Sequence, residues 1–214
     1  MKKLKIIILD YGLGNILSVK RALEYCDAKV IVSSNKKDIL KADKVVLPGV
    51  GAFGVAIKKL KSLGLDDVIK EVNYKETPLL GICLGMQLLL SDSKEFGFNE
   101  GLNLIPGSVI PIPKNSSKIN KIKIPHIGWN QIFSYKENKT GNFLKDSFVN
   151  EYFYFVHSFM AAPKNIENRY ADCNYNGISI PAVIGKNNII GCQFHPEKSG
   201  KTGLNFLHWF CNGK

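Results

Sequence analysis

A strand runs directly into a helix in the segment Pro78-Leu79-Leu80-Gly81-Ile82-Cys83-Leu84-Gly85-Met86-Gln87. The cysteine at the junction has a glycine two residues before it and another two residues after it. A nucleophile on so sharp a turn has strained backbone geometry, and its neighbours at those two positions must lack side chains. The segment therefore predicts that the Cys83 thiol projects above the carboxyl edge of a sheet, where open α/β sheets bind ligands.

The same junction indicates a reactive thiol. The positive end of the following helix favours the thiolate form of Cys83, and the N–H of Leu84 is placed to bind an oxyanion. A buried cysteine between two packing glycines is the alternative interpretation. A base near Cys83 would favour the catalytic interpretation over that alternative.

His195-Pro196-Glu197 is the candidate for that base. In extended backbone, residues two apart point the same way, so Glu197 is expected to orient the imidazole of His195 and to stabilise its cation. Cys192 also lies near His195, but strand alternation makes the two side chains diverge, and no metal site is expected. His157 is expected to pack within a strand, and His208 to be structural.

A glycine-rich loop, Gly49-Val50-Gly51-Ala52-Phe53-Gly54, matches a dinucleotide-binding pattern. Its position after the third strand, with Pro48 before it and no acidic strand end about 20 residues later, weakens that interpretation. The N–H groups of Val50 or Gly51 serve equally well as the second half of an oxyanion hole.

Strands are expected at residues 5–9, 29–33, 44–47 and 78–82, with helices between them. This alternation indicates a three-layer α/β fold, with a mostly parallel central sheet and helices on both faces. From residue 102 onward, short strands and prolines predict a small antiparallel extension, in which residues 151–160 form one strand. A last helix is expected at 203–211. We expect a single domain over residues 1–214.

Composition excludes several classes of protein. The 214 residues are 45% hydrophobic and 22% charged, as in ordinary globular domains. No apolar run is long enough to span a membrane. The net charge is +11, but 27 of the 29 basic residues are lysines and they are scattered, so we expect no nucleic-acid binding. Five cysteines, an odd number, favour free thiols and a cytoplasmic protein.

Taken together, the segments at residues 48–51, 81–87 and 193–199 resemble those of class I, triad-type glutamine amidotransferases. The resemblance implies a flavodoxin-like three-layer fold. It also implies that Cys83 attacks the side-chain amide of glutamine and forms a thioester, with His195 and Glu197 completing the triad. It implies an oxyanion hole at Leu84 with Val50 or Gly51. It also implies that Gln87 and the backbone near Ser158 hold the amino-acid end of glutamine, and that no cofactor is needed.

Within this family, the segments at residues 10–15, 101–107, 125–130 and 155–158 resemble the glutaminase subunits of imidazole glycerol phosphate synthases. That resemblance implies a heterodimer with a cyclase subunit of (β/α)8-barrel type, which receives the ammonia in histidine biosynthesis. A paralogous glutaminase that feeds an amidotransferase of nucleotide-sugar biosynthesis is the alternative. A stand-alone cysteine hydrolase or chaperone of similar fold is a third possibility, which Glu197 and Gln87 argue against.

A partner that receives ammonia must dock where the thiol opens, at the carboxyl ends of the parallel strands. We expect three residues to contact it: Asn15 in the first turn, Trp129 in a turn at residues 126–130, and Lys198 beside the triad. Exposed tryptophans commonly anchor interfaces. The alternative for Trp129 is burial under the proline-rich extension.

Overall fold

The structure is a computed structural model, and it describes residues 3–117, 120–135 and 148–213. Its main feature is a nine-stranded sheet with the order β11-β10-β13-β14-β15-β4-β3-β1-β2. The five strands from β15 to β2 are mutually parallel, and the remaining four are antiparallel to their neighbours. The expected α/β fold with a mostly parallel central sheet and an antiparallel extension is confirmed.

The strands of this sheet lie close to the ranges that the sequence predicts in the first half of the chain. They are β1 (Lys5–Leu9), β2 (Lys29–Ser33), β3 (Lys44–Gly49), β4 (Leu79–Cys83), β10 (His126–Ser134), β11 (Tyr152–His157), β13 (Arg169–Tyr175), β14 (Ile178–Lys186) and β15 (Ile189–Cys192). Strands β3 and β4 are buried along their whole length, as expected for a parallel sheet covered on both faces.

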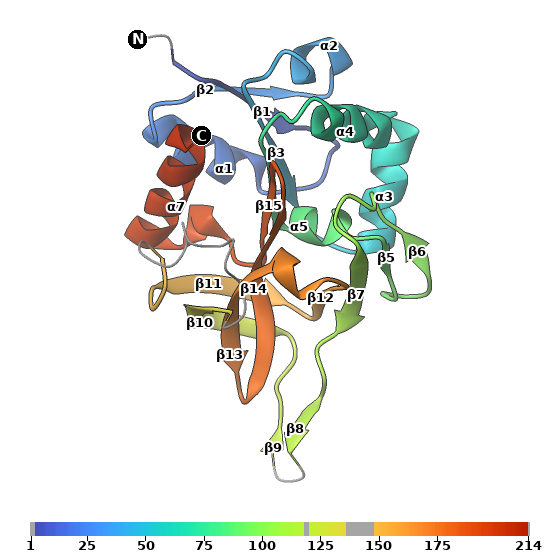
Figure 1. The fold of residues 1–214 in the computed structure, drawn as a ribbon, viewed down its shortest axis with the longest axis vertical. Coiled ribbons are helices and arrows are strands. Elements are labelled where there is room, and N and C mark those ends of the chain that lie inside the picture. The colour runs from blue at the N-terminus through green and yellow to red at the C-terminus, as the bar shows by residue number, and fades with distance from the viewer. Residues whose placement is uncertain (1–2, 118–119, 136–147, 214) are drawn as a thin grey trace.

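Helices cover both faces of the parallel strands (Figure 1). On one side lie α1 (Ile16–Tyr25) and α7 (Gly200–Asn212), and on the other lie α3 (Phe53–Ser62), α4 (Leu65–Tyr74) and α5 (Leu84–Leu88). The short α2 (Lys36–Ile39) is capped by the Asn35 side chain, which accepts hydrogen bonds from the N–H groups of Lys37 and Asp38. The sheet thus separates two hydrophobic cores, one under each helical layer.

A second sheet, of order β12-β7-β5-β6, lies beside the first. Its strands are β5 (Asp92–Ser93), β6 (Asn99–Glu100), β7 (Gly107–Pro111) and β12 (Phe159–Pro163). A two-stranded sheet of β8 (Asn115–Ser117) and β9 (Asn120–Lys121) projects from the body in Figure 1. The described residues also form two one-turn 3-10 helices, η1 (Ile166–Asn168) and η2 (Pro196–Lys198).

Two expectations for the second half are wrong. Residues 151–160 form no single strand, because the chain leaves the main sheet at Ser158: β11 pairs with β10, whereas β12 pairs with β7 of the second sheet. Residues 126–130 form no turn but begin β10, a nine-residue strand that pairs with both β11 and β13. Along the first part of β10, exposed residues alternate with buried or half-buried ones, as in a strand with one face to solvent. Polar residues within this segment obscure the alternation in the sequence.

Candidate active site

Cys83 ends β4 in strained backbone geometry. Its φ of 54° and ψ of −110° lie in a region that L-residues rarely adopt, and α5 begins at the next residue. A Cβ on Gly81 would lie 2.8 Å from the Gly85 carbonyl oxygen, and one on Gly85 would lie 1.8 Å from the Leu47 oxygen in β3. The predicted elbow and its need for two glycines are therefore confirmed. Backbone atoms pack directly against both glycines. This packing holds the Cys83 thiol at the carboxyl edge of the sheet.

His195 lies close to Cys83, and the two residues interact. The ring nitrogen Nδ1 of His195 lies 2.9 Å from Oε1 of Glu197. Burial by itself lowers the pKa of His195, but the hydrogen bonds and negative charges of Cys83 and Glu197 outweigh it and raise that pKa to about 10. The imidazole is thus held in its protonated form beside the sulfur. The chain reaches this geometry through η2 rather than through the extended strand that the sequence suggested, since β15 ends at Cys192.

The carboxylate of Glu197 is almost fully buried, with 1% of its side chain exposed. Its Oε1 also accepts a long hydrogen bond of 3.4 Å from Nδ2 of Asn15. Its Oε2 has no hydrogen-bond partner among the described residues. Such an orphaned acceptor costs free energy, so the triad carboxylate is fixed by the fold at some expense in stability.

A cavity of about 340 Å³ opens at Cys83 and His195. Its wall includes Val50, Gly51 and Leu84, the three residues expected to form the oxyanion hole. Leu84 is the first residue of α5, so its N–H belongs to the group that a helix leaves without an internal partner. The loop after β3 therefore faces the thiol, as the oxyanion interpretation of Gly49–Gly54 requires.

Gln87 and Ser158 line the same cavity, and so do Glu95 and His157. Nε2 of Gln87 donates to the Phe159 carbonyl at 3.1 Å and to Oε1 of Gln193 at 3.0 Å. The amide oxygen of Gln87 is therefore the atom of this side chain that can bind a ligand. Sequence analysis missed Glu95, whose Oε2 accepts a 2.6 Å hydrogen bond from the Phe53 N–H. It also underrated His157, and no local pattern in the sequence marks either residue.

The three expected interface residues lie around this site. Asn15 is half-buried and contacts Glu197, Lys198 is exposed directly after the triad, and Trp129 is 53% exposed on β10. Trp129 packs edge-on against Tyr154 of β11, so burial under the extension is wrong. His208 points away from the site on the exposed face of α7, and its N-terminal neighbours in that helix pack into the core.

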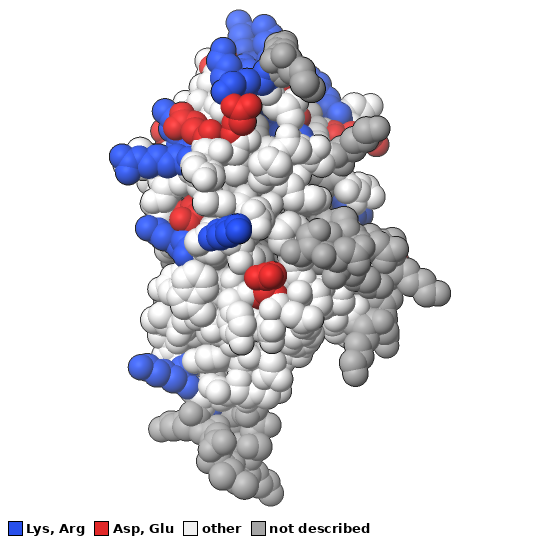
Figure 2. Space-filling view, turned by 90° about the vertical axis from the view of Figure 1, so that its left-hand side faces the viewer, with Lys and Arg blue, Asp and Glu red and all other residues white. Residues whose placement is uncertain are grey.

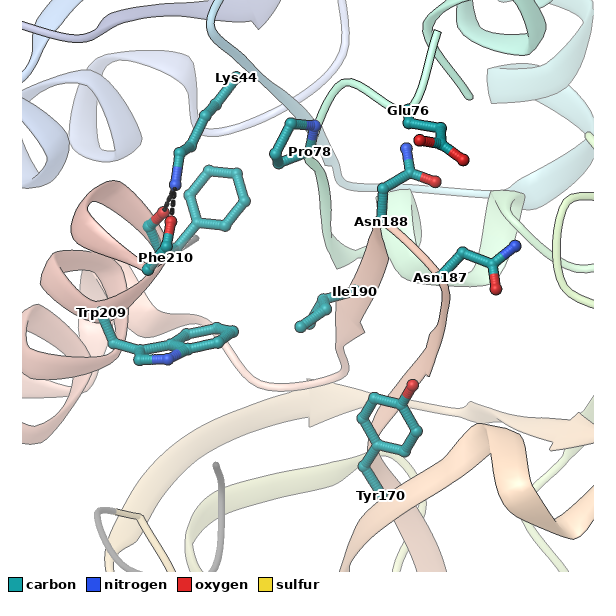
Figure 3. Close-up of a pocket in the computed structure, with 10 residues that line it drawn as sticks. Lys44, Glu76, Pro78, Tyr170, Asn187, Asn188, Ile190, Trp209 and Phe210 are labelled. Atoms are coloured by element: carbon teal, nitrogen blue, oxygen red, sulfur yellow. Dashed lines mark hydrogen bonds between the residues drawn. The ribbon is translucent and has the colours of Figure 1, made fainter. Parts of the chain in front are cut away.

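A second, larger cavity of about 800 Å³ lies at the opposite, amino ends of the parallel strands. Figure 3 shows Lys44 there, with Nζ directed at main-chain oxygens at the end of α7. It bonds the carbonyl oxygens of Phe210 and Gly213. None of the triad residues lines this cavity. Within the described ranges, no group of three or more His, Cys, Asp or Glu side chains is placed to hold a metal ion.

On the face in Figure 2, Lys, Arg, Asp and Glu side chains lie mostly in the upper part, where basic and acidic side chains are interspersed. No helix that the structure describes is long and apolar enough to cross a membrane.

Residues 7–211 match the family Glutamine amidotransferase class-I. The chain belongs to this family. Several solved amidotransferase structures share its fold. A protein described only as glutamine amidotransferase gives a TM-score of 0.68 at 14% identity, covering 97% of this chain and 99% of the other. PurLQS from Thermotoga maritima gives 0.67 at 17% identity, covering 97% of each chain. The elbow at Cys83 thus lies in a fold that this amidotransferase shares with these solved structures.

Curated relatives of this amidotransferase are much closer in sequence. Imidazole glycerol phosphate synthase subunit HisH 1 of Legionella pneumophila (strain Lens) is 50% identical over 205 residues, which cover 95% of this chain and 96% of the relative. The HisH subunit of Lactococcus lactis subsp. lactis (strain IL1403) is 44% identical over 96% of this chain and 97% of that protein. The similarity therefore extends over nearly the full length of both proteins.

Proposed function

We propose that this chain is the glutaminase subunit of an imidazole glycerol phosphate synthase and acts in histidine biosynthesis. The observation that carries the proposal is the convergence of Cys83, His195 and Glu197 on one cavity, in a chain 50% identical to a HisH protein. The whole chain, residues 1–214, serves as one amidotransferase domain. It needs no cofactor and works in the cytoplasm as one half of a heterodimer.

The reaction begins when the Cys83 thiolate attacks the side-chain amide carbon of glutamine. The N–H of Leu84, with that of Val50 or Gly51, stabilises the oxyanion that forms. His195 then donates its proton to the departing nitrogen, ammonia leaves, and a glutamyl thioester remains on Cys83. Water attacks the thioester, His195 accepts a proton from that water, and glutamate and the free thiol are regenerated. Glu197 holds the ring of His195 throughout.

Two oxygen acceptors in the cavity wall suit the α-ammonium group of glutamine. The Gln87 amide nitrogen is already used by Phe159 and Gln193, so this side chain presents its oxygen. Glu95 has one carboxylate oxygen bound by the Phe53 N–H and one available to a ligand. Glu95 supplies the negative charge that distinguishes an amino acid from a simple amide. The backbone near Ser158 remains the candidate for the α-carboxylate.

An apolar face beside the cavity suits the partner subunit. The outer sides of β10 and β11 expose Ile127, Trp129, Tyr152 and Val156, which we call the partner face. Ile127 is paired with Val156, and Val156 also lines the cavity. The apolar surface therefore continues into the place where ammonia is released. We infer that a cyclase subunit of (β/α)8-barrel type covers this face, with Asn15 and Lys198 at its edge.

A glutaminase assay tests this function. The chain is assayed together with the cyclase subunit of imidazole glycerol phosphate synthase from the organism of a HisH relative. Glutamate production should require Cys83, so Cys83→Ala should abolish it, whereas Cys173→Ala, which removes a buried thiol outside the cavity, should not. With Cys83→Ala, product formation from added ammonium salts should persist. If the chain fails to support that cyclase but supports a nucleotide-sugar amidotransferase, the histidine assignment is wrong and the glutaminase assignment stands.

A further inference from the structure

A chain of short contacts leads from β10 into the wall of the cavity. Oδ1 of Asn130 lies 2.7 Å from Nε2 of His126, and Nδ1 of His126 lies 2.9 Å from Nε2 of His157. Nδ1 of His157 then lies 2.8 Å from the carbonyl oxygen of Phe159. The two imidazoles therefore connect the side chain of Asn130, on β10, with the main-chain oxygen of Phe159 beside the active site.

The contacts continue from Phe159 to the nucleophile. The Phe159 oxygen also accepts the 3.1 Å hydrogen bond from Nε2 of Gln87, and this nitrogen donates to Oε1 of Gln193 at 3.0 Å. Nε2 of Gln193 in turn donates to Sγ of Cys83 at 3.7 Å. Gln193 is fully buried, so water does not compete for these bonds. The Phe159 oxygen is thus linked to the thiol through the side chains of Gln87 and Gln193.

Both ends of the histidine pair are acceptors. The Asn130 amide is oriented by its Nδ2, which donates to the Asn174 carbonyl oxygen at 3.1 Å, so its Oδ1 must face His126. Phe159 presents a backbone carbonyl, which has no proton to give. The N···N contact in the middle also needs a proton. The three contacts together require three protons.

Two neutral imidazoles carry only two protons. Burial lowers the pKa of His126, and it lowers that of His157 to about 3, so the pair is neutral near pH 7. Stacking of His126 between the rings of Phe155 and Tyr175 fixes the ring in place. One of the three contacts must therefore be without a proton, and the rings cannot turn away to relieve it.

We propose that His126 and His157 are positioning residues that keep one of their two protons in the contact between the rings and the other at either Asn130 or Phe159, which gives two arrangements. In the first, Nε2–H of His126 donates to Asn130 and Nε2–H of His157 donates to His126. In the second, Nδ1–H of His126 donates to His157 and Nδ1–H of His157 donates to Phe159. Both hold two protons, so their exchange needs no net uptake or release.

The second arrangement is the one that supports the reaction. It gives the Phe159 oxygen a donor on each side and so fixes Gln87, Gln193 and Cys83, whereas the first sets a lone pair of His157 against that oxygen. Asn130 follows Trp129 of the partner face on β10. The Asn130 side chain points to the opposite face of β10 from Trp129, so a partner bound at Trp129 acts on it by moving β10. This inference rests on the proposed function: a movement of β10 that breaks the contact between Asn130 and His126 favours the second arrangement and raises glutaminase activity.

Nitrogen-15 NMR of histidine-labelled protein tests the arrangements directly, because protonated and unprotonated ring nitrogens resonate far apart. The chain contains four histidines, and variants at His195 and His208 identify the remaining two. We expect His126 and His157 of the free chain each to be singly protonated, both on Nε2, and both to shift to Nδ1 in the cyclase complex. Three results would overturn the proposal: three protonated nitrogens in the pair, protons on Nε2 of His126 and Nδ1 of His157, or a pattern that the cyclase leaves unchanged.

Asn130→Leu keeps the size of the side chain and removes one acceptor. The two protons then satisfy the remaining two contacts, so the free variant should show Nδ1–H on both rings. Its glutaminase rate without cyclase should rise roughly 10-fold, within the range of ordinary allosteric coupling. The matched control is Gln131→Leu, because Gln131 bonds the Asn150 carbonyl and lies outside the chain of contacts.

The control should leave both the ring protonation and the basal rate unchanged. If Asn130→Leu retains Nε2–H on both rings, the proposal is wrong whatever the rate. If the wild-type chain shows the expected protonation but hydrolyses no glutamine with any cyclase, the proposed function fails while the two arrangements stand. The readouts therefore separate the two claims.

Discussion

The two ends of the parallel strands in this protein are built in opposite ways. At the carboxyl end, Cys83 has a positive φ and Oε2 of Glu197 is buried without a partner among the described residues. At the amino end, the Lys44 ammonium is buried but bonds the carbonyl oxygens of Phe210 and Gly213 at the end of α7. A buried acceptor without a partner thus lies where a reaction would occur, whereas a buried charge with two acceptors lies where α7 must be held. The difference teaches that changes at the two ends should affect different properties.

The largest effect is expected from Cys83→Gly. Removing the thiol should abolish glutamine hydrolysis, a loss of at least about 10⁴-fold, because no other group can form the thioester. The same change should raise the free energy of unfolding by roughly 1 kcal/mol relative to Cys83→Ala, since glycine adopts this backbone geometry without strain. Activity assays with thermal unfolding check both. Equal stability of the two variants would contradict the strain at the elbow.

Glu197→Gln should reduce the rate by roughly 10²-fold, at the lower end of the range for acid–base catalysis. His195 must be protonated to release ammonia, and its pKa of about 10 keeps it so until the pH rises through that value. Activity of the wild type should therefore fall on the alkaline side near pH 10. The amide removes a negative charge that raises this pKa, so the alkaline limb should move to lower pH.

A pH–rate profile of both proteins measures the position of that limb. Cys83 chemistry is common to the two proteins, so any displacement reports the imidazole. An alkaline limb at the same pH in wild type and Glu197→Gln would show that the carboxylate does not stabilise the cation.

Trp129→Ala extends the comparison to the surface beside the carboxyl end. It should weaken cyclase binding by about 2 kcal/mol, roughly 30-fold in Kd, as expected for a large aromatic anchor. Tyr74→Ala is the matched control, because Tyr74 is an exposed aromatic residue on α4 and is 87% exposed. Titration of each variant with the cyclase measures the effect. If both variants bound the cyclase equally less tightly than the wild type, the partner face would not be part of the interface.

The smallest effect on activity is expected at the amino end. Lys44→Met should leave glutaminase activity per folded molecule unchanged and lower the free energy of unfolding by about 1–3 kcal/mol, because two main-chain acceptors lose a charged donor. Lys41→Met, an exposed lysine nearby in the sequence, should change neither. Urea unfolding followed by an assay of the folded fraction separates the two quantities. A loss of activity without a loss of stability would contradict the division between the ends.

Much of this arrangement could be predicted from local patterns. The elbow at Cys83, the first four strands and the pairing of His195 with Glu197 each depend on residues close together in the sequence. Periodicity and glycine placement report such features well. The site's expected oxyanion residues also follow from segments adjoining predicted strands.

The parts that could not be predicted depend on contacts between distant segments. Glu95 reaches the cavity because β5 and β6 fold back on the start of α3, where it bonds the Phe53 N–H. The break at Ser158 is set by pairing of β12 with β7 about fifty residues earlier. A hydrophobic run of ten residues carries no sign that its halves belong to two sheets. Tertiary pairing, not local propensity, decides such cases.

The contact between Gly85 and Leu47 also bears on how fast the site can respond. With a Cβ excluded at 1.8 Å from the Leu47 oxygen, α5 cannot slide along β3, and the elbow and the start of the glycine loop form one rigid unit. Any adjustment of the oxyanion donors is then confined to rotation of one or two peptide planes near Gly51, whose φ is +96°. Such local rotations take nanoseconds to microseconds. Activation would then be limited by the diffusional rate at which the partner binds, because no slow rearrangement of the site would have to follow binding.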